Sequence, residues 1–387
     1  MGFYVNPPAD GFEAVLKSNR YVDKSELIAY TNRVIGTESM LTCFSRPRRF
    51  GKSFAAKMLV AYYSKGADSR TLFKKLKIAD MGDEEAHLFE AHLNQHDVLF
   101  IDVTSFISMA SDIGDTVTDL QSDIIKELIK TYPGCISDGT KSLFRALMQV
   151  HEGTGNKFFV IIDEWDALFR EAKDNEELQK SYIQLLRGMF KSGQTSQVIT
   201  GAYMTGILPI KKYGTQSALT DFKEFTMLEP GPLAPFIGFT ENEVKYLCET
   251  NGLDFEKTRK WYDGYRFNMD EHIYCPNSIM ELVSRKKFDS YWTKTETYES
   301  LRDYIDLDWL GLRDGILDML GGKGCRIDTG TFQNDMTSIS SRDDIFTLLV
   351  HLGYLAYDFD KEEVFIPNEE VRKEFVRAMK VTRVLRR

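Results

Sequence analysis

Short apolar runs alternate with amphipathic stretches from Tyr21 to about Pro235. The short runs predict buried strands, whereas apolar positions that recur every three or four residues predict helices. This alternation is typical of an α/β domain with a mainly parallel sheet. The predicted strands are Leu41–Phe44, Val98–Val103, Phe158–Ile162, Val198–Met204 and Phe225–Leu228, and the predicted helices are Lys52–Tyr63, Val117–Tyr132, Lys141–Glu152 and Asn175–Lys191.

The pattern changes after the segment LEPGPLAPF, which carries three prolines. Thr240 and Glu243 then form a predicted capping box, and helical patterns dominate to about Val283. Near the C-terminus a helix, two strands around a turn at Asp360-Lys361 and another helix follow one another, the order in which a winged helix ends. The predicted division is an α/β domain at 1–235, a helical lid at 236–290 and a helical, winged-helix-like domain at 291–387.

Composition narrows the class of protein. A net charge of -9 and a pI near 5.4 argue against a chain that coats nucleic acid with its whole surface. Five scattered cysteines without a CxxC pair predict a reducing compartment, with neither a disulfide framework nor a zinc site. The N-terminus does not resemble a signal peptide, and no apolar run reaches the roughly 20 residues that cross a bilayer. We therefore expect a cytoplasmic protein without a membrane partner.

The segment SRPRRFGKSF, from Ser45 to Phe54, has the features of a phosphate-binding loop. It follows a predicted strand and precedes a helix that starts at Lys52, so backbone N–H groups and the helix dipole would face the phosphates. Lys52 would reach the β and γ phosphates, and the Ser53 hydroxyl would bind Mg²⁺. The candidate phosphate-binding residues are Arg46, Pro47, Arg48, Arg49, Phe50, Gly51, Lys52, Ser53 and Phe54.

Arg46 stands where the standard spacing places the first glycine of such a loop. That glycine serves the turn, and Pro47 can rigidify the same turn instead. The alternative interpretation is a chance Gly-Lys-Ser tripeptide in an arginine-rich surface loop. Arg48 and Arg49 fit either a contact with phosphate, in this or a neighbouring subunit, or a solvated surface.

A second motif, KFFVIIDEWDALF, ends a predicted strand with Asp163 and Glu164. Beside a phosphate loop, Asp163 would hold Mg²⁺ and Glu164 would polarise the attacking water; alone, the motif fits an ordinary strand with an acidic end. An acidic pair in this order is typical of NTPases with an extra strand between the two motif strands. That strand should bring a polar sensor to the γ-phosphate, and Thr205 is a better candidate than Thr200, although either fits a plain strand residue.

The successive motifs RPRRFGKS, IIDEWDAL, TGILPI, WYDGYRF, YCPNSI and IPNEEV resemble those of the bacterial and archaeal AAA-ATPase-like family. The resemblance runs from about Tyr21 to near Val371, and in that family the arginine at the first glycine position is the normal form. It implies a P-loop ATPase domain of the AAA/STAND-like branch, with ATP and Mg²⁺ as cofactors. Members often carry a PD-(D/E)XK nuclease-like domain after the ATPase; its motif is not found here, so nuclease activity is not expected.

Three functions follow as hypotheses. The first is a Mg²⁺-dependent ATPase in which Glu164, Lys52 and Thr205 act in catalysis and turnover moves the lid and the C-terminal region. The second is a nucleotide-gated switch with negligible hydrolysis; Glu164 discriminates, because a mere binder needs no carboxylate that polarises water. The third is an effector that acts on nucleic acid or a protein partner through the C-terminal region. The segment from Val371 to Arg387 contains seven Lys or Arg residues and one Glu, so it is strongly basic. A homo-oligomer is compatible with all three.

Overall fold

The computed structural model describes residues 2–18, 20–210, 219–267, 271–292, 311–332 and 339–385. The chain forms two compact units. The N-terminal unit comprises Met1–Phe44, Lys52–Gly206 and Ile210–Glu224, and the C-terminal unit comprises Ser45–Gly51, Ile207–Pro209 and Phe225–Arg387. In the described ranges, no helix combines the length and the hydrophobicity that crossing a bilayer requires.

The N-terminal unit is built on a mainly parallel five-stranded sheet with the order β2-β3-β4-β1-β5. β2 pairs with β3 and β3 with β4 in parallel, so that Asp102 lies beside Asp163. The strands are β1 (Leu41–Ser45), β2 (Asp97–Asp102), β3 (Phe158–Asp163), β4 (Ile199–Gly206) and β5 (Lys223–Phe225). The helices are α1 (Asp10–Lys17), α2 (Leu27–Val34), α3 (Lys52–Tyr63), α4 (Arg70–Phe73), α5 (Asp83–His92), α6 (Val103–Met109), α7 (Thr116–Thr131), α8 (Leu143–Thr154), α9 (Ala167–Glu171), α10 (Glu176–Phe190) and α11 (Thr195–Val198).

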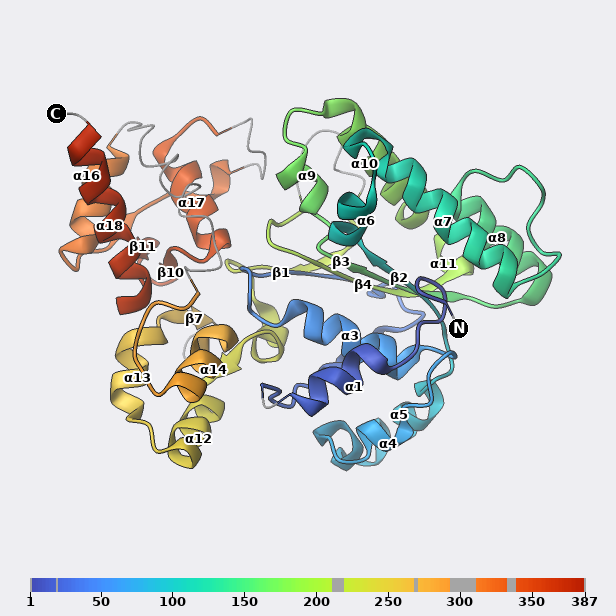
Figure 1. Cartoon of the computed structure of the whole chain (residues 1–387), viewed down its shortest axis with the longest axis horizontal. Helices are drawn as coiled ribbons and strands as arrows, with labels where there is room; N and C mark the ends of the chain where they lie inside the picture. The colour runs from blue at the N-terminus through green and yellow to red at the C-terminus, as the bar shows by residue number, and fades with distance from the viewer. Residues whose placement is uncertain are drawn as a thin grey trace. The chain divides into compact units, whose positions relative to one another are not determined.

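Helices cover both faces of this sheet. α6 to α10 lie on one face, and α1, α3, α4 and α5 lie on the other (Figure 1). Every residue of β3 is buried, as expected for a central strand of a parallel sheet between two helical layers. The amphipathic pattern of α7 and α8 places their apolar residues, among them Ile124 and Leu147, in the same hydrophobic core.

The predicted counterparts of β1 to β4 and of α3, α7, α8 and α10 end within two residues of the observed elements, whereas the other helices of this unit were not predicted. The extra strand expected between the two motif strands is β4, which lies between β1 and β3. The strand predicted at Phe225–Leu228 is wrong, because β5 ends at Phe225. The Thr226 hydroxyl accepts hydrogen bonds from the N–H groups of Leu228 and Glu229, so the chain turns where the apolar pattern suggested continued extension.

The C-terminal unit contains two three-stranded sheets, with the orders β6-β8-β7 and β10-β11-β9. The first sheet lies in the predicted helical lid and was missed, because each strand is only two to four residues long. Its strands are β6 (Phe239–Thr240), β7 (Tyr265–Phe267) and β8 (Glu271–Tyr274), and the second sheet consists of β9 (Cys325–Arg326), β10 (Ala356–Asp358) and β11 (Glu363–Phe365). The helices are α12 (Glu241–Asn251), α13 (Phe255–Tyr262), α14 (Pro276–Arg285), α16 (Leu312–Leu320), α17 (Arg342–Leu352) and α18 (Glu369–Leu385).

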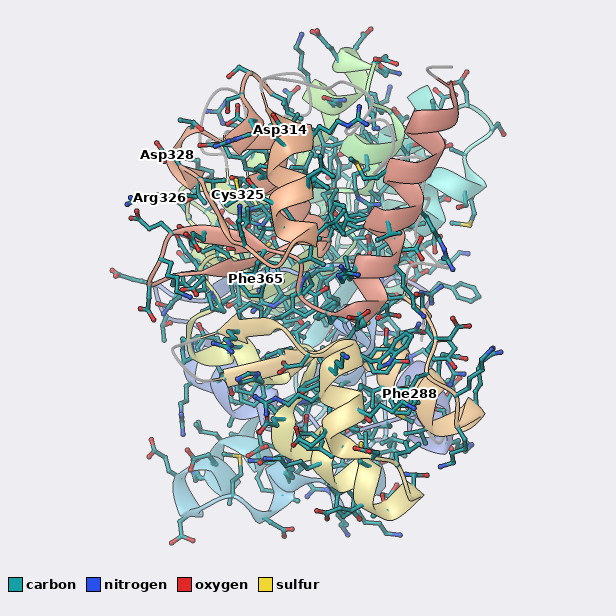
Figure 2. The ribbon with its side chains drawn as sticks, turned by 90° about the vertical axis from the view of Figure 1, so that its left-hand side faces the viewer. Phe288, Asp314, Cys325, Arg326, Asp328 and Phe365 are labelled. Carbon is teal, nitrogen blue, oxygen red and sulfur yellow. The ribbon has the colours of Figure 1, made fainter. Side chains whose placement is uncertain are left out.

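The end of the chain follows the predicted order of helix, hairpin and helix. α17 precedes the antiparallel pair β10–β11, and β9 pairs with the other side of β11. Figure 2 labels Cys325 and Arg326 on β9 and Phe365 on β11. The segment before α17 falls partly outside the described residues, so the winged helix stays a prediction.

Glu370, at the start of α18, is a buried carboxylate that holds the C-terminal unit together. It accepts hydrogen bonds from the backbone N–H groups of Tyr291 (2.5 Å) and Trp292 (2.8 Å). The Ser278 hydroxyl donates a third, at 2.8 Å. Burial raises the pKa of Glu370 to about 7, although these hydrogen bonds oppose the shift.

We expect Glu370 to make the C-terminal unit less stable as the pH rises from about 4.5 to 7. In the folded state the Glu370 carboxyl keeps its proton to a higher pH than its ordinary pKa of 4.5. Its contribution to the free energy of unfolding is therefore complete below pH 4.5 and is lost as the pH rises through the folded-state pKa. The shift corresponds to roughly 3 kcal/mol. Denaturant unfolding of the wild type and of Glu370→Gln across this pH range tests the expectation. In Glu370→Gln, the free energy of unfolding should no longer fall with pH by this amount. If the free energies of the variant and of the wild type change with pH in parallel, the expectation is wrong.

Candidate nucleotide-binding site

The start of α3 places Lys52 and Ser53 at the end of the predicted phosphate loop. Lys52 is the first residue of the helix and is 4% exposed, although it carries a charged side chain. Gly51, just before it, has a φ of +95°, a conformation that residues with a side chain rarely adopt. The glycine and the buried lysine therefore both fit the loop that the sequence predicted.

Asp163, the last residue of β3, lies beside Ser53 and Thr205. The Thr205 hydroxyl donates a hydrogen bond of 2.5 Å to Asp163 Oδ1, and the Ser53 hydroxyl donates another to the same carboxylate. Asp163 is 6% exposed, and burial raises its pKa although both hydroxyls lower it. Parallel strands β3 and β4 end at the same edge of the sheet, which brings Asp163 and Thr205 together.

Glu164 lies next to Asp163 in a strained backbone conformation. Its φ is +55°, which is uncommon for a residue other than glycine, and its N–H donates to Thr205 Oγ1 at 3.3 Å. The carboxylate lies 3.7 Å from Lys52 Nζ. The structure therefore gathers Lys52, Ser53, Asp163, Glu164 and Thr205 into one cluster of the N-terminal unit.

Arg170 on α9 is a member of this cluster that the sequence prediction missed. Its Nη2 donates to Glu164 Oε2 at 2.5 Å, and its Nε donates to Asp166 Oδ2 at 3.2 Å. Its side chain is only 13% exposed. The i, i+4 spacing of Asp166 and Arg170 predicts their ion pair. The contact with Glu164 depends on the bend of the chain after β3, and no sequence pattern indicated it.

The end of β4 lies close to the residues that follow Glu164. The N–H of Trp165 donates to the carbonyl of Thr205 at 2.8 Å. A Cβ atom on Gly206 would lie 2.5 Å from Trp165 Nε1, so only glycine fits beside the indole. This close contact fixes the turn that carries Glu164 against the strand that carries Thr205.

Arg46, in the place of the first loop glycine, is fully buried in the C-terminal unit. Its guanidinium lies 4.8 Å from the ring centroid of Phe267 and donates to the carbonyl of Phe225 at 3.1 Å. These contacts anchor the start of the loop. The Arg46 side chain therefore packs inside the C-terminal unit, and phosphate binding at Arg46 stays a prediction.

The rest of the loop also packs within the C-terminal unit. The Trp292 indole N–H donates to the carbonyl of Arg48 at 3.0 Å, and Cys275 Sγ lies 3.8 Å from the carbonyl of Arg49. Phe50 is buried and packs edge-on against Tyr265, with ring centroids 5.5 Å apart.

Pro47 and Phe54 are the remaining candidate phosphate-binding residues of this segment. Pro47 packs closely against Gly353, because a Cβ atom added to Gly353 would lie 2.8 Å from Pro47 Cγ. Phe54, on α3 of the N-terminal unit, is 39% exposed.

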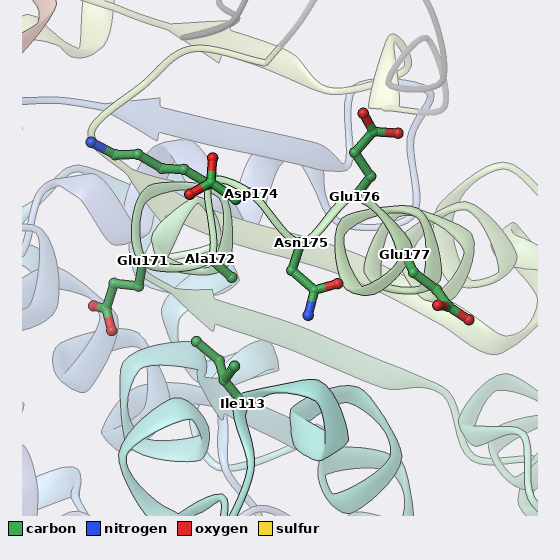
Figure 3. A pocket seen from close by; sticks show the side chains of 8 residues that line it. Ile113, Glu171, Ala172, Asp174, Asn175, Glu176 and Glu177 are labelled. Carbon is green, nitrogen blue, oxygen red and sulfur yellow. The ribbon is translucent and has the colours of Figure 1, made fainter.

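A separate hollow of about 610 Å³ lies between η2 (Ile113–Asp115) and the loop from α9 to α10. Its lining includes Glu171, Asp174, Glu176 and Glu177 (Figure 3). Four carboxylates outweigh the one lining lysine, Lys173, and would repel a triphosphate, so this hollow is not a candidate for the nucleotide. Lys211 and Lys212, a lysine pair just after β4 in the sequence, lie outside the described residues.

The chain is similar to a protein family and to individual known proteins. A family model described as predicted AAA-ATPase matches residues 10–215. An uncharacterized protein in the vnfD 5' region of Azotobacter chroococcum mcd 1 is 26% identical over 292 residues, 74% of this chain, and the chain spans about half (52%) of that relative's length. The solved ORC2 protein of Aeropyrum pernix, in ADPNP-ADP complexes, aligns over 94% of this chain and 99% of its own with 12% identity and a TM-score of 0.35, too low to bear on the fold.

Proposed function

The chain belongs to the AAA-ATPase-like family of predicted AAA-ATPases, and we propose that it binds ATP with Mg²⁺ and hydrolyses it. Lys52 would neutralise the β and γ phosphates, and the backbone N–H groups of the loop would cradle them. Glu164 would accept a proton from the attacking water. Thr205 would sense the γ-phosphate.

The contact of Ser53 with Asp163 carries this proposal. A hydroxyl at the start of α3 and a buried carboxylate at the end of β3 meet although they are far apart in the sequence. Oxygen ligands of these two kinds fit Mg²⁺, which binds through few protein oxygens and keeps several waters. When bound, the ion would neutralise charge that develops on the phosphates. Ser53 and Asp163 would hold it, directly or through water.

We further propose that nucleotide in the loop acts on the conformation of the C-terminal unit. The loop residues from Ser45 to Gly51 cluster with that unit, whereas Lys52 begins α3 of the other. The Trp292 and Phe50 contacts tie the loop to the segment held by Glu370 and to β7. A change in loop conformation would therefore reach both the lid and the C-terminal region.

One observation favours a second function, a nucleotide-gated switch with little hydrolysis. Arg170 holds Glu164 through an ion pair of 2.5 Å in a mostly buried position. A carboxylate bound to a guanidinium is a weaker base, because the positive charge favours its ionised form. If Glu164 stays in this pair when ATP is bound, the water is not activated and the protein remains in its ATP state.

Nucleotide binding by the full chain tests the proposed function. We expect Lys52→Ala to weaken Mg²⁺-dependent ATP binding about 10- to 100-fold, the usual effect of losing a hydrogen bond to a charged group in a buried site. Calorimetric titration with ATP measures the affinity, and phosphate release measures hydrolysis. Lys57→Ala, on the exposed side of the same helix, is the matched control and should bind as the wild type does.

Two results would count against the proposal. ATP binding that is equally tight in Lys52→Ala would show that the loop does not hold the triphosphate. Wild-type protein that binds Mg²⁺–ATP but releases no phosphate would leave the switch as the better function.

A further inference from the structure

Three potential metal ligands meet at the small sheet of the C-terminal unit. Glu241 begins α12 directly after β6, Asp263 precedes β7, and His272 lies on β8. One ligand atom from each lies within 4.8 Å of the others. His272 Nδ1 lies 2.9 and 2.7 Å from the two carboxylate oxygens of Asp263. Asp263 comes from the motif WYDGYRF, to which the proposed ATPase function assigns no role.

Tyr274 gives a second, independent indication of a ligand at this place. It follows His272 by two residues on β8, so the two side chains leave the same face of the sheet. The residue is fully buried, yet its hydroxyl has no hydrogen-bond partner in the part of the chain that the structure describes. A buried hydroxyl normally has a partner, so one is missing here.

We propose that Glu241, Asp263 and His272 bind a divalent transition-metal ion, for which Zn²⁺ fits best, and that the Tyr274 hydroxyl hydrogen-bonds to the water that completes its coordination. An imidazole nitrogen with two carboxylate oxygens is a ligand set for Zn²⁺. Mg²⁺ and Ca²⁺ favour oxygen ligands alone, so the histidine separates this site from the proposed ATP site. The cysteine pattern predicted no zinc site, and none of these ligands is a cysteine.

Two cationic side chains border the cluster and must give way to the ion. Lys245 Nζ lies 2.8 Å from Glu241, and Arg259 Nε lies 3.6 Å from Asp263. Both side chains are nearly half exposed, at 45% and 47%. Exposed ion pairs contribute little to stability, and both side chains can rotate away from the cluster so that their charged groups lie in solvent. The bound ion would link three segments: the start of α12, the turn that precedes β7, and strand β8.

Zinc binding by the nucleotide-free full chain tests the site. To exclude the proposed magnesium site, the background carries Asp163→Asn. Zn²⁺ binding is measured by titration of the protein in competition with a chromophoric chelator. We expect each chain to bind one Zn²⁺. His272→Gln should lower the affinity at least about 10-fold, and Tyr274→Phe should lower it by about 10-fold, as is usual for a partner of a metal-bound water. His92→Gln is the control, because His92 and His96 form a rival pair with ring nitrogens 2.9 Å apart.

A measurement that needs no variant keeps the test independent of folding. Co²⁺ in place of Zn²⁺ should give the visible absorption of a site with nitrogen and oxygen ligands, without thiolate charge-transfer bands. Absence of stoichiometric Zn²⁺ binding, or binding that His92→Gln abolishes and His272→Gln leaves intact, would overturn the proposal. The cluster would then be a network of ion pairs without a metal.

Discussion

Replacing Glu164 with glutamine is expected to abolish nearly all ATP turnover while ATP still binds. A positioned general base contributes about 100- to 10,000-fold to a rate, and glutamine cannot accept the proton from water. The substitution keeps the size of the side chain, and Lys52 and Ser53 remain in place for the phosphates and the ion. The loss should therefore appear in kcat, with little change in the Kd for ATP.

Phosphate release under saturating ATP and calorimetric titration separate these two effects. Glu171→Gln is the matched control, since Glu171 is an exposed acid at the end of α9 and should turn over ATP as the wild type does. Equal turnover in Glu164→Gln and the wild type would show that another group activates the water. Arg170→Ala adds a useful comparison, because it releases Glu164 from its ion pair.

Much of the N-terminal unit could be predicted because its chemistry is local in the sequence. Apolar runs such as FFVII define central strands, which are buried on both faces. The order of the two motifs also predicted an intervening strand, which is β4, and the structure places Thr205 at its end against Asp163. Here local pattern and global fold agree.

The parts that could not be predicted depend on contacts between distant segments. Arg46 is read from the sequence as a candidate phosphate ligand, yet its side chain is buried against Phe267, far along the chain. The strands of the small lid sheet are too short for a period to appear. Arg170 and the cluster around His272 are likewise joined only by the fold. Propensity and spacing carry no information about such contacts.

Substitution of Gly264, the glycine of the motif WYDGYRF, is expected to have the largest effect on the stability of the C-terminal unit. Gly264 has a φ of +119°, and a Cβ atom on it would lie 2.2 Å from the carbonyl oxygen of Pro367. Because that oxygen belongs to the backbone, Gly264→Ala cannot be relieved by a rotamer change, and we expect a loss of about 3 kcal/mol or more. Gly252 offers the matched control: its φ is +63°, and nothing lies within 4 Å of the place that an alanine methyl group would occupy. Gly252→Ala should cost only about 1 kcal/mol.

Hydrogen exchange resolved by segment measures both changes in the full chain, because local opening of the C-terminal unit need not unfold the rest. In Gly264→Ala, amides of β7 and β8 should exchange about 100-fold faster or more, whereas Gly252→Ala should change them about fivefold. Amides of β3, in the N-terminal unit, serve as the internal reference and should not change. Similar rates in the two variants would mean that the chain at Gly264 moves away from Pro367 at little cost. The glycine of this motif would then be dispensable for the packing of β7, and the position of Asp263 beside His272 would not depend on it.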